Sequence, residues 1–188
     1  MSTTSIVVLV VVVVIAIAVI AMLLRTRRTQ KLKSRFGPEY TRAVEQTGSR
    51  NRAEANLEKL EKRVQHYGLS PLLASARTEF VAEWQRIQSR FVDDPEGALL
   101  DADQLIQKLM QARGYPLADF EQRAADISVD HPLVVEHYRA GHEIALRHAQ
   151  GRANTEDLRQ AMIHYRTLFS ELSGEPEMAR AAATVGRA

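Results

Sequence analysis

Five of the six histidines in this 188-residue chain lie within one stretch near its C-terminus. They are His131, His137, His142, His148 and His164. Neutral imidazole is a common ligand of zinc and similar ions, and it also exchanges protons near neutral pH. Metal-binding histidines on one helix are typically three or four residues apart, but the spacings here are 6, 5, 6 and 16. The sequence therefore predicts no metal ion, no other cofactor and no assigned catalytic residue.

A site could still form between two neighbouring helices. Tyr138 and His142 lie on one helical pattern, and His164 lies on the next. Together with Glu143, the two histidines could hold a metal from opposite sides. We keep Tyr138, His142 and His164 as candidates for a ligand-binding or metal-assisted enzymatic site. The competing interpretation is that each of them is a structural or surface position.

The motifs of common enzyme classes are absent from the sequence. All nine glycines occur singly, so there is no glycine-rich phosphate loop, and no nucleophile elbow is present. The chain contains no cysteine, which removes disulfides, thiolate metal sites and a cysteine nucleophile. These absences favour a non-enzymatic protein and leave the enzymatic alternative open.

The N-terminal part is strongly apolar. Residues 6–24 read IVVLVVVVVIAIAVIAMLL and contain no charged side chain. As a helix rising about 1.5 Å per residue, they would extend roughly 28 Å, close to the ~30 Å hydrocarbon core of a bilayer. We predict a transmembrane helix there, with residues 1–5 as a short extracytoplasmic N-terminus. The alternatives are a buried core helix and a cleaved signal peptide, although residues 1–5 lack the basic residues of a signal peptide.

A cluster of basic residues follows the apolar run, and none precedes it. Its members are Arg25, Arg27, Arg28, Lys31, Lys33 and Arg35. The positive-inside rule then predicts that the rest of the chain lies in the cytoplasm. Residues 25–35 are expected to form a basic juxtamembrane segment, and the lipid bilayer is the first predicted partner.

The remainder of the chain is mildly acidic. Residues 36–188 hold the other 19 basic residues and all 23 acidic residues, which gives a net charge of −4. Nucleic-acid binding needs a basic surface, so nucleic acid is not an expected partner.

Helical periodicity runs through residues 36–173, and no alternating strand pattern of useful length interrupts it. We predict an all-α domain there of about five to six helices, followed by a flexible tail at 174–188. The expected helices are 39–46, 50–67, one starting at Ser70-Pro71, one at Asp94-Pro95, a short one at 117–125, one at Asp130-His131-Pro132, and one capped by Asn154. The stripe from Leu73 through Trp84 to Phe91 marks a core helix, and Leu133 is expected on an inner face.

Several short segments carry a family resemblance. They are Phe36-Gly37-Pro38-Glu39-Tyr40, Phe91-Val92-Asp93-Asp94-Pro95, Ala102-Asp103, Arg113-Gly114-Tyr115-Pro116 and Thr155-Glu156-Asp157-Leu158-Arg159-Gln160-Ala161-Met162. The chain resembles an uncharacterised family of bacterial single-pass membrane-anchored helical proteins. The resemblance implies bacterial origin and membrane anchoring, and it supplies no catalytic residues.

Together these features predict a membrane-anchored cytoplasmic helical domain. We expect it to act as an interaction or adaptor module that binds a protein partner or a second copy of itself. The alternative is the ligand-binding or enzymatic site around His142 and His164.

Overall fold

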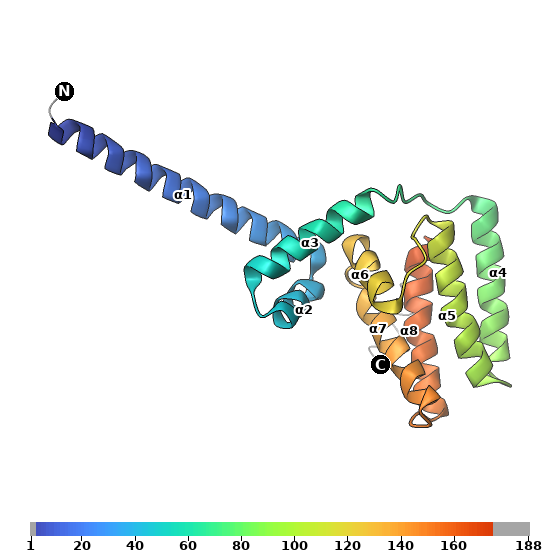
Figure 1. Ribbon diagram of the computed structural model, residues 1–188. Helices are drawn as coiled ribbons and strands as arrows, with labels where there is room; N and C mark the ends of the chain where they lie inside the picture. Colours follow the sequence, from blue (N-terminus) through green and yellow to red (C-terminus); the bar gives the residue numbers. More distant parts are fainter. Residues whose placement is uncertain (1–2, 175–188) are drawn as a thin grey trace, which may run out of the picture. The chain divides into compact units, whose positions relative to one another are not determined.

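A computed structural model describes the backbone of residues 3–174 and the side chains of residues 11–174. Within this part the chain contains α-helices joined by loops and no strands, which confirms the predicted all-α class. The helices are α1 (Thr3–Phe36), α2 (Pro38–Thr47), α3 (Arg50–Gln65), α4 (Ala74–Arg90), α5 (Pro95–Ala112), α6 (Phe120–Asp130), α7 (Val135–Ala149) and α8 (Thr155–Ser173) (Figure 1). The chain divides into two compact units, Met1–Leu57 and Glu58–Ala188, with the boundary inside α3.

The first unit is organised around the C-terminal part of α1, which packs against α2. Leu32 and Phe36 of α1 are buried, as is Tyr40 of α2. Residues 25–35, predicted as a basic juxtamembrane segment, form the last turns of α1 before Phe36. The basic segment is therefore a helix with one buried face.

The apolar part of α1 ends at Leu24. In the part of the chain whose side chains are described, no helix is long and apolar enough to cross a membrane. The described apolar run covers residues 11–24, and the side chains of residues 6–10 lie outside the described residues. The transmembrane helix at 6–24 therefore stays a prediction.

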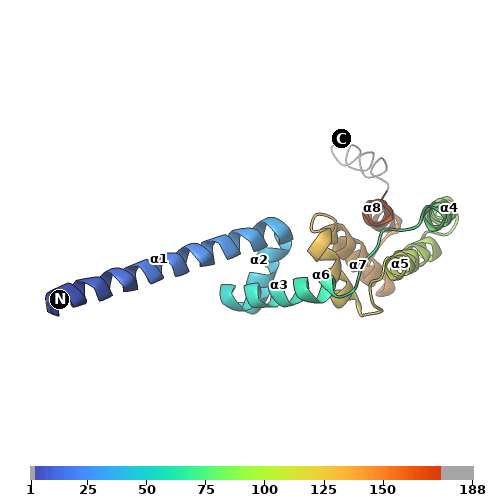
Figure 2. The same ribbon diagram turned by 90° about the horizontal axis from the view of Figure 1, so that it is seen from above.

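The second unit is a helical bundle. Helix α8 packs against α5, α7 and α4, while α4 also packs on α5 and α6 packs on α7. Figure 2 shows α4 and α8 nearly end-on, with α5 beside them. The centre of the core is a stack of Trp84 from α4 on Phe169 from α8, with ring centroids 4.9 Å apart. The seven residues predicted for the inner face of the last helix are all buried: Leu158, Ala161, Met162, Tyr165, Leu168, Phe169 and Leu172.

Two helix starts follow the sequence prediction closely. Asp94 caps α5 by accepting a hydrogen bond from the amide of Gly97, and Pro95 occupies the first helical position. Asn154 and Asp157 form a reciprocal capping box at the start of α8. Both signals depend only on residues within one turn, which explains why the sequence reveals them.

The predicted start at Ser70-Pro71 is wrong, because α4 begins at Ala74 after the extended residue Leu73. The amide of Ser70 donates to the carbonyl of Arg113 instead, and Leu72 is buried. The segment before α4 is therefore held against the end of α5. Leu73, expected in the core stripe, is 76% exposed.

The boundary between α6 and α7 also differs from the prediction. The short helix expected at 117–125 runs instead from Phe120 to Asp130, with Asp119 as its N-cap. Asp130 therefore ends one helix and does not start the next, and Leu133 lies in the connecting turn at 77% exposure. Residues 38–173 of the described chain contain seven helices, one for each segment expected from the sequence and more than the five to six estimated for the domain.

Gly174 ends α8 in the left-handed conformation, with φ of 76°, which glycine adopts without a steric cost. Beyond it, residues 175–188 of the predicted tail lie outside the described residues.

Candidate functional site

The structure pairs His164 with His137, which the sequence did not single out. Their Nδ1 atoms are 2.9 Å apart, and their ring centroids are 5.2 Å apart. His137 lies on α7 and His164 on α8, and both side chains are half-buried. Two Nδ1 atoms at this distance share one proton, so one ring donates a hydrogen bond and the other accepts it.

Gly141 lies at the contact between α7 and α8, one turn beyond His137. It is buried on the inner face of α7. A Cβ atom added there would lie 3.5 Å from the Cβ of His164 and from the ring of Tyr165, which is an ordinary van der Waals distance. The two helices are therefore in close contact here, and the space would also accept an alanine.

The environment keeps the histidine pair neutral near neutral pH. Burial lowers the pKa of His137, against a smaller opposing effect of the nearby Glu136 carboxylate. Burial also lowers the pKa of His164, and the neighbouring His137 lowers it further. If both imidazoles became positively charged, two positive charges would lie beside each other.

His142 and Tyr138, the other two predicted candidates, both contact Phe120 of α6. The imidazole of His142 stacks on the Phe120 ring with a centroid distance of 3.6 Å, and Tyr138 packs against it at 4.8 Å. Burial lowers the pKa of His142. The structure thus places His142 and Tyr138 on one aromatic cluster, while His164 contacts His137.

The hydroxyl groups of the buried tyrosines hold the helices together. Tyr138 accepts a hydrogen bond from Arg123 Nε at 2.9 Å, and Tyr165 donates to Asp103 Oδ1 at 3.1 Å. Burial is the main reason that the pKa of Tyr138 rises to about 12 and that of Tyr165 also rises. Both phenols therefore stay protonated, which suits cross-helix hydrogen bonding better than proton transfer near pH 7.

Two other histidines lie near helix ends. His131, just after α6, lies 3.0 Å from Glu171 Oε1 through Nδ1 and 3.2 Å from a guanidinium nitrogen of Arg113 through Nε2. His148, near the end of α7, lies 3.4 Å from Glu96 Oε2. These contacts link α8 to the end of α6 and α7 to the start of α5.

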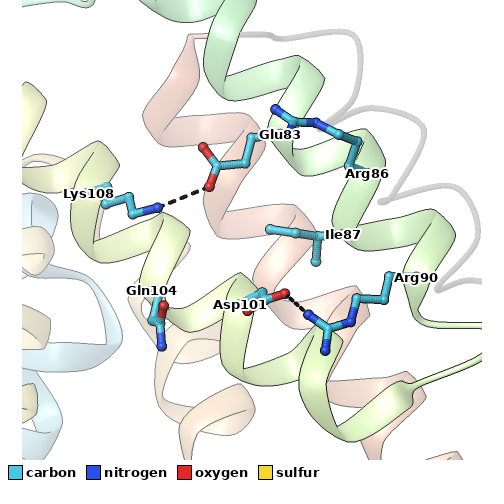
Figure 3. Close-up of a pocket in the computed structure, with 7 residues that line it drawn as sticks. All are labelled: Glu83, Arg86, Ile87, Arg90, Asp101, Gln104 and Lys108. Atoms are coloured by element: carbon cyan, nitrogen blue, oxygen red, sulfur yellow. Dashed lines mark hydrogen bonds and ion pairs between the residues drawn. The ribbon is translucent and has the colours of Figure 1, made fainter.

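A groove of about 230 Å³ lies between α4 and α5, and the sequence analysis missed it. Figure 3 shows its lining from the two helices. The lining residues are Glu83, Arg86, Ile87, Arg90, Asp101, Gln104 and Lys108. Ile87 is buried at its floor, while the other lining side chains are polar. In the sequence, the polar lining residues of each helix recur at spacings of three and four residues, which places them on one face of that helix.

Two ion pairs bridge the groove, as the dashed lines in Figure 3 show. Arg90 binds Asp101 at 2.5 Å, and Lys108 binds Glu83 at 3.1 Å. Arg86 donates through Nε only to the carbonyl of Ala82 within the described part of the chain. The guanidinium of Arg86 and the amide of Gln104 therefore supply polar groups that a bound segment could use.

The basic residues of α1 do not all act alike. Arg28 approaches the buried carboxylate of Glu54 at 4.0 Å, and the ammonium of Lys33 lies over the ring of Tyr40 at 5.5 Å. Arg35 is half-buried, whereas Arg25, Arg27 and Lys31 are exposed. Part of the predicted membrane flank thus also stabilises the first unit.

No cluster of three or more potential metal ligands occurs among the described residues. Comparisons with known protein families, curated proteins and solved structures found no match for this chain. The resemblance to a family of membrane-anchored helical proteins therefore stays a prediction.

Proposed function

We propose that this chain is a membrane-anchored helical interaction module of the bacterial inner membrane, with its bundle in the cytoplasm. The observation that carries the proposal is the open, charge-lined groove between α4 and α5. The polar side chains of the buried interior are engaged differently, since Tyr138, Tyr165 and Asp103 hold one helix to another. The groove is a place where a partner can bind without disturbing the core.

The anchor is supported by the exposure of α1. Every described side chain from Val11 to Leu24 is exposed, and all of them are apolar. A continuous apolar surface of this kind is unfavourable in water, and lipid can cover it. The apolar residues at 6–10 extend the sequence pattern to the length of a bilayer core. The basic residues after Leu24 favour the cytoplasmic orientation.

The groove suits a polar protein segment better than a small apolar ligand. The Arg90–Asp101 and Lys108–Glu83 pairs lie toward its two ends, and Gln104 lies between them along α5. An amide in this place can bond to a peptide backbone, while Arg86 can pair with an acidic side chain. The partner is therefore a protein segment with an acidic residue, from another protein or a second copy.

Site-specific photo-crosslinking in intact membranes tests the groove. A photoreactive residue replacing Gln104 should give a discrete adduct, and the added substitution Arg86→Glu should abolish it. The matched control is the same residue at Gln85, which is exposed on α4 and does not line the groove. Equal labelling from both positions, or none from Gln104, contradicts the proposed docking place.

Reporter fusions test the anchor separately. A phosphatase fused after Ala188 should be inactive and a fluorescent protein there should be active, because the bundle faces the cytoplasm. Extraction of the protein into the soluble fraction by alkaline carbonate would contradict the anchor and leave the groove proposal standing.

A further inference from the structure

The two units of the chain carry opposite net charges. The nine basic and three acidic residues of Met1–Leu57 give +6, whereas the sixteen basic and twenty acidic residues of Glu58–Ala188 give −4. Two of the three acidic side chains of the first unit, Glu39 and Glu54, are buried. Glu45 is the one exposed carboxylate among the described side chains of this unit. The charged surface of the first unit is therefore almost wholly cationic.

The exposed cations come from all three helices of the first unit. Besides the basic residues at 25–35 of α1, Arg42 of α2 and Arg50 and Arg52 of α3 are exposed. The sequence prediction confined the basic segment to residues 25–35. Folding extends it into a surface that includes two further helices.

Glu54 determines where the start of α3 lies along α1. Its carboxylate accepts a hydrogen bond from Thr29 of α1 at 2.7 Å. Thr29 lies five residues beyond Leu24, which is roughly 7.5 Å along an α-helix axis. The headgroup layer outside the hydrocarbon core is roughly 5–7 Å thick on each side of a bilayer. Figures 1 and 2 show α3 running away from the apolar turns of α1, so its first residues, Arg50 and Arg52, lie nearer to the headgroup layer than Glu54.

A surface of lipid phosphates suits this arrangement better than RNA. Each basic residue near an anionic leaflet adds a roughly fivefold preference for it. Proteins that bind single-stranded RNA also use basic residues, but they stack the bases on exposed aromatic side chains. Phe36 and Tyr40, the two aromatic residues of Met1–Leu57, are both buried.

We propose that the first unit binds the anionic phospholipid headgroups of the cytoplasmic leaflet, with Arg42, Arg50 and Arg52 adding to the basic residues of α1. The inference rests on the proposed anchor, because the predicted span at 6–24 holds this unit at the leaflet. Burial of Glu54 serves the binding in two ways, since it removes a carboxylate from the surface and seats α3 on α1. The lipid-binding surface belongs to the first unit alone and is independent of the α4–α5 groove.

Fluorescence quenching tests the proposal with the full chain in phosphatidylcholine vesicles. The chain has no cysteine, so Asn51→Cys carries a single fluorophore at an exposed position between Arg50 and Arg52. A trace of nitroxide-labelled phosphatidylglycerol should quench it about fivefold more effectively than the same trace of nitroxide-labelled phosphatidylcholine. Adding Arg50→Gln/Arg52→Gln should lower this preference at least about threefold. Arg152→Gln/Arg159→Gln is the matched control, because it removes two exposed cations from the second unit, and it should leave the preference unchanged.

Salt provides a second measurement that does not depend on how a variant folds. The preference should approach one in roughly 1 M salt, where the screening length shrinks to about 3 Å. A preference that is near one at low salt, independent of salt or unchanged by Arg50→Gln/Arg52→Gln overturns the proposal.

Flotation of the same vesicles separates this proposal from the anchor. If the chain floats with the vesicles and shows no preference, the inference fails while the anchor stands. A chain that does not float with them contradicts the anchor and the inference together. Loss of the preference when single-stranded RNA is added at physiological salt shows that the surface takes nucleic acid, and it overturns the inference as well.

Discussion

The two units of the chain differ in the contact that joins their helices at the centre. The first buries Glu54 and brings hydroxyl groups to its carboxylate: Thr29 donates at 2.7 Å and Tyr40 at 2.9 Å. The second has an aromatic centre in which Trp84 stacks on Phe169. Both units also bury the other kind of group, since the first buries Leu32 and Phe36 and the second buries Asp126. The carboxylate shared by α1, α2 and α3 and the aromatic stack between α4 and α8 are the two contacts compared below. Mutations should separate these two sources of stability.

The largest expected effect comes from the aromatic core of the second unit. Phe169→Ala leaves a cavity beside Trp84 and should lower the free energy of unfolding of the bundle by about 3–5 kcal/mol. Urea titration followed by the fluorescence of Trp84, the only tryptophan, measures this loss. Hydrogen exchange of α2 should be unchanged, and acceleration there would show that the two units unfold together.

The buried carboxylate of the first unit should give the next largest effect. Glu54→Ala leaves the hydroxyls of Thr29 and Tyr40 without their acceptor and should cost about 2–3 kcal/mol of local stability. Faster hydrogen exchange in α2 and the start of α3, with an unchanged Trp84 transition, is the expected result. Glu54→Gln keeps an acceptor oxygen and should show a smaller loss. If both variants behave like the wild type, the carboxylate does not organise this unit.

A single cross-helix hydrogen bond should matter less. Tyr165→Phe removes the hydroxyl that donates to Asp103, although Gln107 continues to donate to the same carboxylate at 2.6 Å. The expected loss is about 1 kcal/mol in the urea titration of the bundle. Thr167→Val, on the same helix, removes a hydroxyl whose one bond within the described residues goes to the carbonyl of Ile163, and it should change the stability less.

Acidification should destabilise the second unit by the smallest amount. The pKa values of His137, His142 and His164 are lowered in the folded chain, chiefly by burial. The unfolded chain therefore binds more protons, and stability should fall as the pH drops below about 6.5 toward the folded pKa values.

The groups around these rings come from several helices. Glu136 lies near His137, while Asp103, Glu121 and Arg123 act on His142. Urea midpoints measured across this pH range should depend less on pH in the His137→Gln/His164→Gln double variant. An unchanged slope would show that the pair does not contribute.

The sequence predicted features that local chemistry determines. Asp94-Pro95 and Asn154 mark helix starts because their hydrogen bonds close within one turn. Ser70-Pro71 carries the same local signal, but the amide of Ser70 bonds to Arg113, more than 40 residues away in the sequence. Tertiary contacts of this kind override a capping signal and leave no trace in the local pattern.

The arrangement of the candidate residues follows only in part from the sequence. The sequence places Tyr138 and His142 on one helix, and in the structure both contact Phe120. The partner of His164 depended on how α7 and α8 align, and this alignment brings the Nδ1 atom of His137 within 2.9 Å of the Nδ1 atom of His164. The alignment of two packed helices depends on the side chains of both, so the pattern of one helix alone does not reveal it.

Helix α1 runs without a break from Thr3 to Phe36, so its exposed apolar turns and its buried last turn belong to one rod. Each residue of an α-helix is rotated by about 100° around the helix axis from the residue before it. One alanine inserted between Leu24 and Arg25 would therefore rotate the apolar turns by this angle relative to the buried Phe36. A continuous helix transmits rotation about its axis, so a rotation of the apolar turns would also reach the buried last turn of α1 in the first unit.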